Sequence, residues 1–88
     1  MIQIRSFIMN ISEATAKRIL ELCRAKNITV NKLANISGVT QSTVSDIVNL
    51  KAKNIGIVTI KKLCDGFELT ITDFFNTDYF KTLEQEIF

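Results

Sequence analysis

The segment SGVTQSTVSDIVN, residues 37 to 49, combines short hydrogen-bonding side chains with apolar residues at helical spacing. Gln41, Ser42 and Ser45 would lie on one side of such a helix, with its valines and isoleucine on the other. A surface helix that only has to be soluble usually carries Glu and Lys in these places. Amides and hydroxyls instead form hydrogen bonds without a net charge, so the segment is suited to contacting a polar partner.

Helix start signals recur along the chain from residue 10. Short polar side chains cap a helix by accepting a hydrogen bond from one of its first free N–H groups. Asn10 and Glu13 have the spacing of a capping box, in which each side chain bonds the other residue's backbone. Apolar residues at helical spacing follow such signals. The helices predicted on these grounds are 11–26, a short helix after Thr29, 41–49 after Thr40, one that carries Ile60 to Phe67, and a short one from about Ile71.

Gly38 is expected to end the second of these helices in the left-handed conformation. Two short helices joined by a turn of about three residues around a Gly form a helix-turn-helix. In that motif the amino end of the second helix enters the major groove of DNA, where Gln and Ser can pair with base edges. Residues 10 to 80 contain no Pro and little strand-like alternation. The residues alone therefore predict an all-α fold with a DNA-reading helix over 41–49.

The composition is that of one folded domain. The chain has 88 residues, an apolar fraction of 47% and a formal net charge of +2, values typical of a single globular unit. No run approaches the roughly 18–20 apolar residues needed to cross a membrane. The amino terminus also lacks the features of a signal peptide. We expect a soluble, cytoplasmic protein with no membrane partner.

Catalysis and metal binding are not expected. The chain contains no His, which removes the commonest general base at neutral pH. Cys23 and Cys64 lie within helical patterns, and two thiols without a His cannot complete a tetrahedral zinc site in one chain. We expect both cysteines to be reduced core residues, and we expect no enzyme activity, no cofactor and no metal.

Charge is distributed unevenly along the chain. Five basic and two acidic residues give +3 over residues 1–28, five and one give +4 over 29–62, and one and six give −5 over 63–88. A split of this kind suits a polyanion bound at the basic part. Ordinary scatter of surface charge would give the same counts.

The stretch LANISGVTQSTVSDIVNLKAKN resembles the helix-turn-helix of the Cro/CI repressor family, also called the XRE type. IKKLCDGFELTITDFF resembles the closing helices of that family, so the resemblance covers about residues 10 to 76. It implies a compact five-helix, lambda-repressor-like domain in a transcriptional regulator, typically a repressor. The residues that match the family pattern are Leu33, Ala34, Gly38, Val39, Thr40, Gln41, Thr43, Val44 and Ser45.

The resemblance also implies site residues in two groups. Those expected to contact base edges are Gln41, Ser42, Ser45 and Asp46. Those expected to contact phosphates are Thr29, Asn31, Thr40, Thr43, Lys51, Lys53 and Asn54. For Thr29 and Thr40 simple helix capping is the alternative, and for the two lysines a solvated loop.

Two positions depart from the family pattern. An Asn-Gly pair commonly follows the third helix, whereas this chain has Asn49-Leu50. The turn is therefore made either by Asn49 or by a different backbone route. Ile55 stands where the family commonly has Pro, which leaves Gly56 to cap the next helix.

Three parts are expected: an N-terminal extension 1–9, the DNA-binding domain 10–76 and a C-terminal tail 77–88. The extension alternates like a short strand, and Met9 offers a second possible start of translation. The tail carries an apolar stripe that either packs on the core or joins two copies. We expect a homodimer on palindromic double-stranded DNA that blocks polymerase. The alternative is an antitoxin or adaptor whose tail docks a protein partner.

Overall fold

The computed structural model describes residues 8–87, which form helices and, within that range, no strand. The predicted all-α fold with five α-helices is confirmed. The strand-like alternation expected in the extension falls mainly on residues 1–7, which lie outside the described residues. The helices are α1 (Ile11–Ala25), α2 (Val30–Ser37), α3 (Gln41–Val48), α4 (Ile57–Gly66) and α5 (Ile71–Phe75), followed by the 3-10 helix η2 (Asp78–Thr82).

The helices start where the capping residues predict. The Asn10 Oδ1 accepts a hydrogen bond from the Glu13 N–H at 2.8 Å, and the Asn10 N–H donates to Glu13 Oε1 at 3.0 Å. Thr29, Thr40 and Thr70 each accept from the third N–H of the helix that follows, at 3.0, 3.2 and 3.0 Å. Each such cap is worth about 1 kcal/mol of helix stability, so the starts of α1, α2, α3 and α5 are fixed locally.

The four longer helices, α1 to α4, end in the same way. A residue just past each of them adopts a positive φ: Asn27 at 56°, Gly38 at 69°, Leu50 at 64° and Glu68 at 60°. The N–H of the next residue then bonds back to a carbonyl five positions earlier, which is the Schellman arrangement. The prediction for Gly38 is confirmed, while the other three ends use residues that have a Cβ.

Leu50 resolves the alternative left open for the turn after α3. Asn49 has a φ of −97°, so the left-handed residue is Leu50 itself. Its N–H donates to the Ile47 carbonyl at 3.2 Å, and the Lys51 N–H donates to the Asp46 carbonyl at 2.8 Å. The chain therefore keeps a glycine-type turn and accepts the steric strain of a leucine in it.

Replacing Leu50 by Gly is expected to stabilise the fold by about 0.5–1 kcal/mol. A side chain in the left-handed region costs about 1–2 kcal/mol, while the greater freedom of an unfolded glycine offsets about 0.5–1 kcal/mol of that gain. Leu50 is 48% exposed, so little packing is lost. Urea unfolding measures the change. Leu50→Ala is the control because it keeps the Cβ, and a Gly variant less stable than the Ala variant would contradict the strain at this turn.

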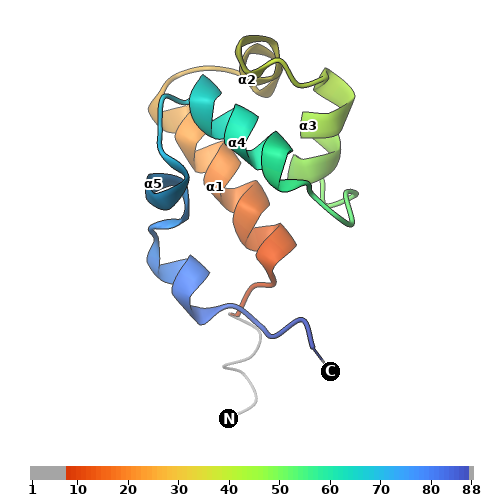
Figure 1. Cartoon of the computed structure of the whole chain (residues 1–88), viewed down its shortest axis with the longest axis vertical. Coiled ribbons are helices and arrows are strands. Elements are labelled where there is room, and N and C mark those ends of the chain that lie inside the picture. The colour runs from red at the N-terminus through yellow and green to blue at the C-terminus, as the bar shows by residue number, and fades with distance from the viewer. Residues whose placement is uncertain (1–7, 88) are drawn as a thin grey trace.

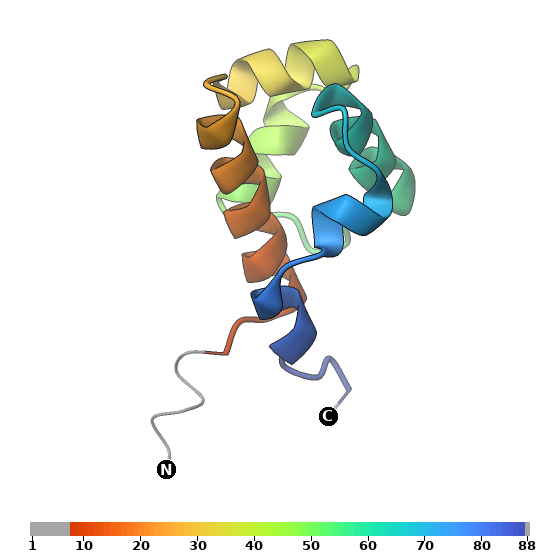
Figure 2. The ribbon, with the colours of Figure 1, turned by 90° about the vertical axis from the view of Figure 1, so that its left-hand side faces the viewer.

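The core takes side chains from all five α-helices. The described cysteines, Cys23 and Cys64, are free and buried within it, as predicted, and burial raises the pKa of both thiols. α2 lies across one end of the molecule in both views, with the C-terminal segment at the other end (Figures 1 and 2). The largest fully buried side chains are Phe67, Phe74, Ile19, Leu33, Ile47, Leu63 and Val44.

The C-terminal segment packs against α1. The Tyr79 hydroxyl donates to Glu21 Oε1 at 2.6 Å, and Lys17 Nζ lies 3.1 Å from Glu21 Oε2 and 5.3 Å from the centre of the Tyr79 ring. The Phe80 ring lies 4.9 Å from that of Phe75. The helical stripe expected in the tail is interrupted, because the chain is extended after η2. Tyr79 and Phe80 of the tail are in contact with their own chain.

Replacing Tyr79 by Phe is expected to destabilise the fold by about 0.5–1.5 kcal/mol at pH 7, the usual net worth of a hydrogen bond. The Tyr79 hydroxyl holds the pKa of Glu21 below its ordinary value, so this stability is present above about pH 4.5 and decreases as pH falls through the lower folded pKa. Burial and the bond to Glu21 raise the pKa of Tyr79 to about 12. The Tyr79–Glu21 hydrogen bond therefore contributes its full stability to the wild type below about pH 10, and that stability is lost as pH rises through about 12.

Urea unfolding of both proteins at pH 3, 7 and 9, with an NMR titration of Glu21, measures this effect. The stability gap between wild type and the Phe variant should shrink at pH 3, and the pKa of Glu21 should rise in the variant. An unchanged Glu21 pKa would show that the hydroxyl does not hold this carboxylate.

Candidate nucleic-acid interface

One side of α3 faces outward and carries all the residues predicted to contact bases. Successive residues of an α-helix are rotated by about 100°, which places Val44 and Ile47 towards the interior, where both are buried. On the opposite arc lie Gln41, Ser42, Ser45, Asp46 and Asn49, which we call the reading face. All are exposed except Ser45, which is half-buried. α3 stands at the edge of the molecule (Figure 1).

Asn49 belongs to the reading face, although the sequence analysis treated it only as a turn residue. Its Nδ2 donates to Ser45 Oγ at 3.1 Å, one helical turn earlier. The spacing of four residues from Ser45 was the signal that could have placed it there. A side-chain amide held in this way presents a donor and an acceptor, the pair that matches adenine in the major groove.

Thr40 and Thr43 form a hydroxyl pair at the amino end of α3. Thr40 Oγ1 accepts from the Thr43 N–H at 3.2 Å and donates to Thr43 Oγ1 at 2.8 Å. The Thr40 proton is therefore used inside the chain, while the Thr43 hydroxyl retains its own proton for an outside acceptor. Capping, the alternative considered for Thr40, is present, and of the two residues Thr43 is the better placed to donate to a phosphate.

Thr29 and Asn31 lie apart from these residues, at the start of α2. Both are exposed, and Thr29 caps the helix through the Lys32 N–H at 3.0 Å. The amino end of a helix carries a partial positive charge and attracts anions. This end of α2 is thus a second place where a phosphate could be held. The loop that follows α3 lies on the other side of α3.

The loop between α3 and α4 carries three of the predicted phosphate contacts, Lys51, Lys53 and Asn54. Asn54 lines a small hollow of about 90 Å³ together with Thr43, Thr59 and Gly56. Gly56 starts α4 without any side-chain cap, so the first N–H groups of that helix remain to be satisfied from outside. Thr59 and Gly56 were not predicted as site residues, because only folding brings them beside Thr43.

Lys51 and Lys53 are exposed in the same loop. Lys53 lines a larger cavity beside the start of α1, and Asn54 lines both this cavity and the smaller hollow. The structure therefore places Asn54 in one lining with Thr43 and in another with Lys53, while Lys51 lines neither cavity. Asp46 is the one acidic residue between positions 29 and 62, so the reading face and its flanks are mostly basic and neutral.

No helix within residues 8–87 is long and apolar enough to cross a membrane. Over the same residues, no group of three or more His, Cys, Asp or Glu side chains is placed to hold a metal ion.

Comparisons with known proteins point to the same segment. The family of Cro/C1-type HTH DNA-binding domains matches residues 18–78. The SPbeta prophage-derived uncharacterized HTH-type transcriptional regulator YopS of Bacillus subtilis (strain 168) is 33% identical over 55 residues, which are 62% of this chain and 74% of YopS. The crystal structure of the prophage Lp1 protein 11 has a TM-score of 0.74 at 29% identity and covers 83% of this chain and 96% of that one. The family match includes α2, α3 and the whole reading face.

Proposed function

This chain belongs to the Cro/C1-type family of helix-turn-helix DNA-binding domains, and from that premise we propose that it is a repressor that reads its operator in the major groove with α3. It is a DNA-binding regulator by family. The observation that carries the finer proposal is the reading face, whose five hydrogen-bonding residues lie opposite the buried Val44 and Ile47. A helix so divided can enter a groove without exposing the core.

Base recognition would come from the reading face. The Gln41 amide, at the first position of α3, can bond an adenine N6 and N7 together. Ser42 and Ser45 can donate or accept at neighbouring base edges. The Asp46 carboxylate can only accept hydrogen bonds, so it would favour a base that presents an amino group in the major groove, cytosine N4 or adenine N6, and would disfavour guanine and thymine. Each good pair is worth about 1–3 kcal/mol of discrimination.

Affinity would come from phosphates on both sides of the groove. Thr29 and Asn31 would hold the backbone at the start of α2. The contacts proposed on the other side come from Thr40, Thr43, Lys51, Lys53 and Asn54. Such contacts position the protein but carry no sequence information themselves.

Replacing Lys51 and Lys53 together by Ala is expected to weaken binding to all duplexes alike. Each lost phosphate contact lowers the slope of log K against log salt by about 0.9, so the double variant should lose about 2 from that slope. Fluorescence titrations at several salt concentrations measure it. Lys81→Ala, on the far C-terminal segment, is the control and should leave the slope unchanged, whereas an unchanged slope in the double variant would remove both lysines from the interface.

A repressor of this size would act by occupying the DNA to which polymerase binds. Two copies on half-sites about one helical turn apart would match a palindromic operator. Selection of duplexes from a random pool by the purified protein, at stated salt, tests this. A palindromic consensus is expected. A protein that enriches no sequence would contradict the proposal and favour the protein-binding alternative.

A further inference from the structure

Two neighbouring hollows lie beside the loop that joins α3 to α4. The larger has a volume of about 340 Å³ and is lined from this loop, from α1, α4 and α5, and from the C-terminal segment. The smaller, of about 290 Å³, lies between the start of α1, the same loop and the C-terminal segment. Ser12, Lys53 and Glu86 line both of them. The two hollows are therefore adjacent, and we call them together the loop hollow.

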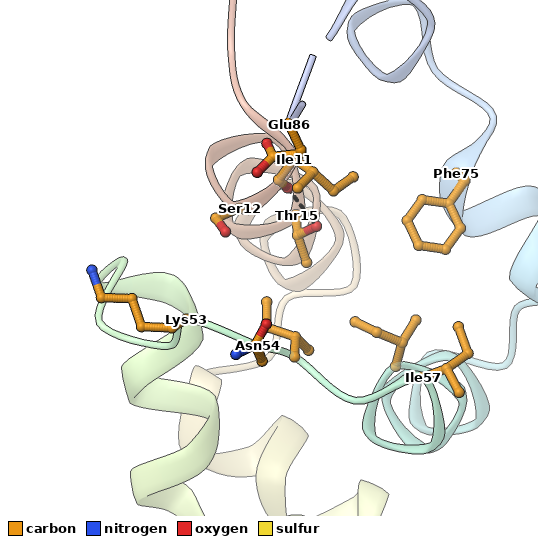
Figure 3. Close-up of a pocket in the computed structure, with 10 residues that line it drawn as sticks. Ile11, Ser12, Thr15, Lys53, Asn54, Ile57, Phe75 and Glu86 are labelled. Atoms are coloured by element: carbon orange, nitrogen blue, oxygen red, sulfur yellow. Dashed lines mark hydrogen bonds between the residues drawn. The ribbon is translucent and has the colours of Figure 1, made fainter. Parts of the chain in front are cut away.

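The larger part of the loop hollow is apolar at its centre. Ile11, Ile57 and Phe75 surround this space from three different helices (Figure 3). Ile57 is 65% exposed, although a large apolar side chain is more stable when it is covered. Sites for small molecules typically measure about 300–1,000 Å³, so this volume is at the lower end. The space suits an apolar group smaller than a drug-sized molecule.

The polar groups of the loop hollow carry both signs of charge. Lys53 and Glu86 line its two parts together with Ser12, and the Asn54 amide lines the larger part. Within residues 8–87, neither Lys53 nor Glu86 takes part in an ion pair. A ligand with one charge would be attracted by one of these side chains and repelled by the other. A ligand that carries both an ammonium and a carboxylate complements the two together.

We propose that the loop hollow binds a small apolar α-amino acid. Its side chain would lie among Ile11, Ile57 and Phe75, its carboxylate would pair with Lys53 and its ammonium with Glu86. An apolar α-amino acid combines the three required features, which are a compact apolar group and two opposite charges close to it. A fatty acid or an apolar amine has only one of the two charges.

The position of the loop hollow couples it to DNA, a step that rests on the proposed function. Lys53 and Asn54 line the hollow and are also proposed phosphate contacts. A carboxylate that holds Lys53 withdraws this positive charge from the phosphate, and phosphate contacts supply much of the affinity for DNA. The amino acid and the operator therefore weaken each other's binding by the same factor. The amino acid would act as an inducer that releases the operator.

An NMR titration of the labelled full-length protein with L-leucine and L-phenylalanine, in the absence of DNA, tests the site. Saturable shifts are expected at the amides of Ser12, Lys53, Asn54 and Ile57. The expected Kd is about 0.1–1 mM, since so small a ligand makes few contacts. Glycine, which has no apolar group, should leave these amides unchanged.

Two analogues of leucine separate the charges. Isocaproate keeps the apolar group and the carboxylate, and isoamylamine keeps the apolar group and the ammonium. Each should bind at least about tenfold more weakly than L-leucine, because one charged hydrogen bond is lost. Equal binding by either analogue, or the absence of saturable shifts up to about 10 mM L-leucine, would overturn the proposal.

Glu86→Gln is the protein variant that matches these analogues, because it removes the charge and keeps the size of the side chain. It should bind L-leucine at least about tenfold more weakly than the wild type. Glu84→Gln is the control, since Glu84 lies two positions earlier and is not in the lining of either hollow. Unchanged leucine affinity in the Glu86 variant would count against the proposal.

Titration of the enriched duplex with and without saturating L-leucine measures the coupling. The affinity of the wild type and of Glu84→Gln for this duplex should fall by about 5- to 150-fold, while Glu86→Gln at the same leucine concentration should change little. An affinity unchanged by saturating leucine would overturn the inducer role. Leucine binding is measured without DNA, so its failure is distinct from a failure to enrich any sequence, which would count against the proposed function.

Discussion

Replacing Gln41 by Ala is expected to weaken binding to the enriched operator by about 1–3 kcal/mol and to relax the preference at one base pair. Gln41 is exposed at the first position of α3, where its amide can make two bonds to one base. The unfolding free energy should hardly change, because the side chain is outside the core.

Titration against the operator and against the three substituted duplexes at the affected position measures this effect. Gln85→Ala is the matched control, since Gln85 is an exposed glutamine on the C-terminal segment. If the affinity of the Gln41 variant fell by the same factor for every duplex, Gln41 would be a contact to the DNA backbone and not to a base.

Replacing Gly66 by Ala is expected to destabilise the fold by about 1–3 kcal/mol, the usual range for inserting a methyl group into a packed site. A Cβ on Gly66 would overlap the Ser37 hydroxyl and would lie 3.1 Å from the Ser37 Cβ and 3.4 Å from its Cα. The hydroxyl can rotate, but the Cα is held in α2. α2 and α4 can therefore approach this closely only if position 66 has no side chain.

Double-mutant analysis with Ser37→Ala tests the cause. Ser37 Oγ is buried without a hydrogen-bond partner in the described chain, and such a group is costly, so Ser37→Ala alone should be neutral or stabilising. In the Gly66→Ala background it should recover part of the loss. Urea unfolding of the four proteins gives the coupling, and strictly additive effects would show that the two residues do not collide.

Features set by a few neighbouring residues could be predicted from the sequence. The helix caps act through backbone groups within a few positions, so residue type and spacing were sufficient to predict them. These caps are Asn10 with Glu13, Thr29, Thr40 and Gly38. The burial of Val44 and Ile47 followed from helical periodicity for the same reason.

Features set by distant or strained residues could not be predicted. Glu21 and Tyr79 are 58 positions apart, and nothing in the sequence pairs them. Leu50 adopts the left-handed region that residue preferences reserve for Gly or Asn, because the bonds that close the turn after α3 require it. The hollow between Thr43 and Thr59 exists only once the loop after α3 has folded and brought the start of α4 near Thr43.

The central claim is that the reading face of α3 meets DNA. An amide-resolved NMR titration of the labelled protein with the enriched duplex tests it most directly. The account predicts the largest shifts at residues 41 to 49, with smaller ones at the start of α2 and in the loop 51–54, and little change in η2. Shifts concentrated in η2 and the amino end of α1, with residues 41 to 49 unmoved, would contradict it.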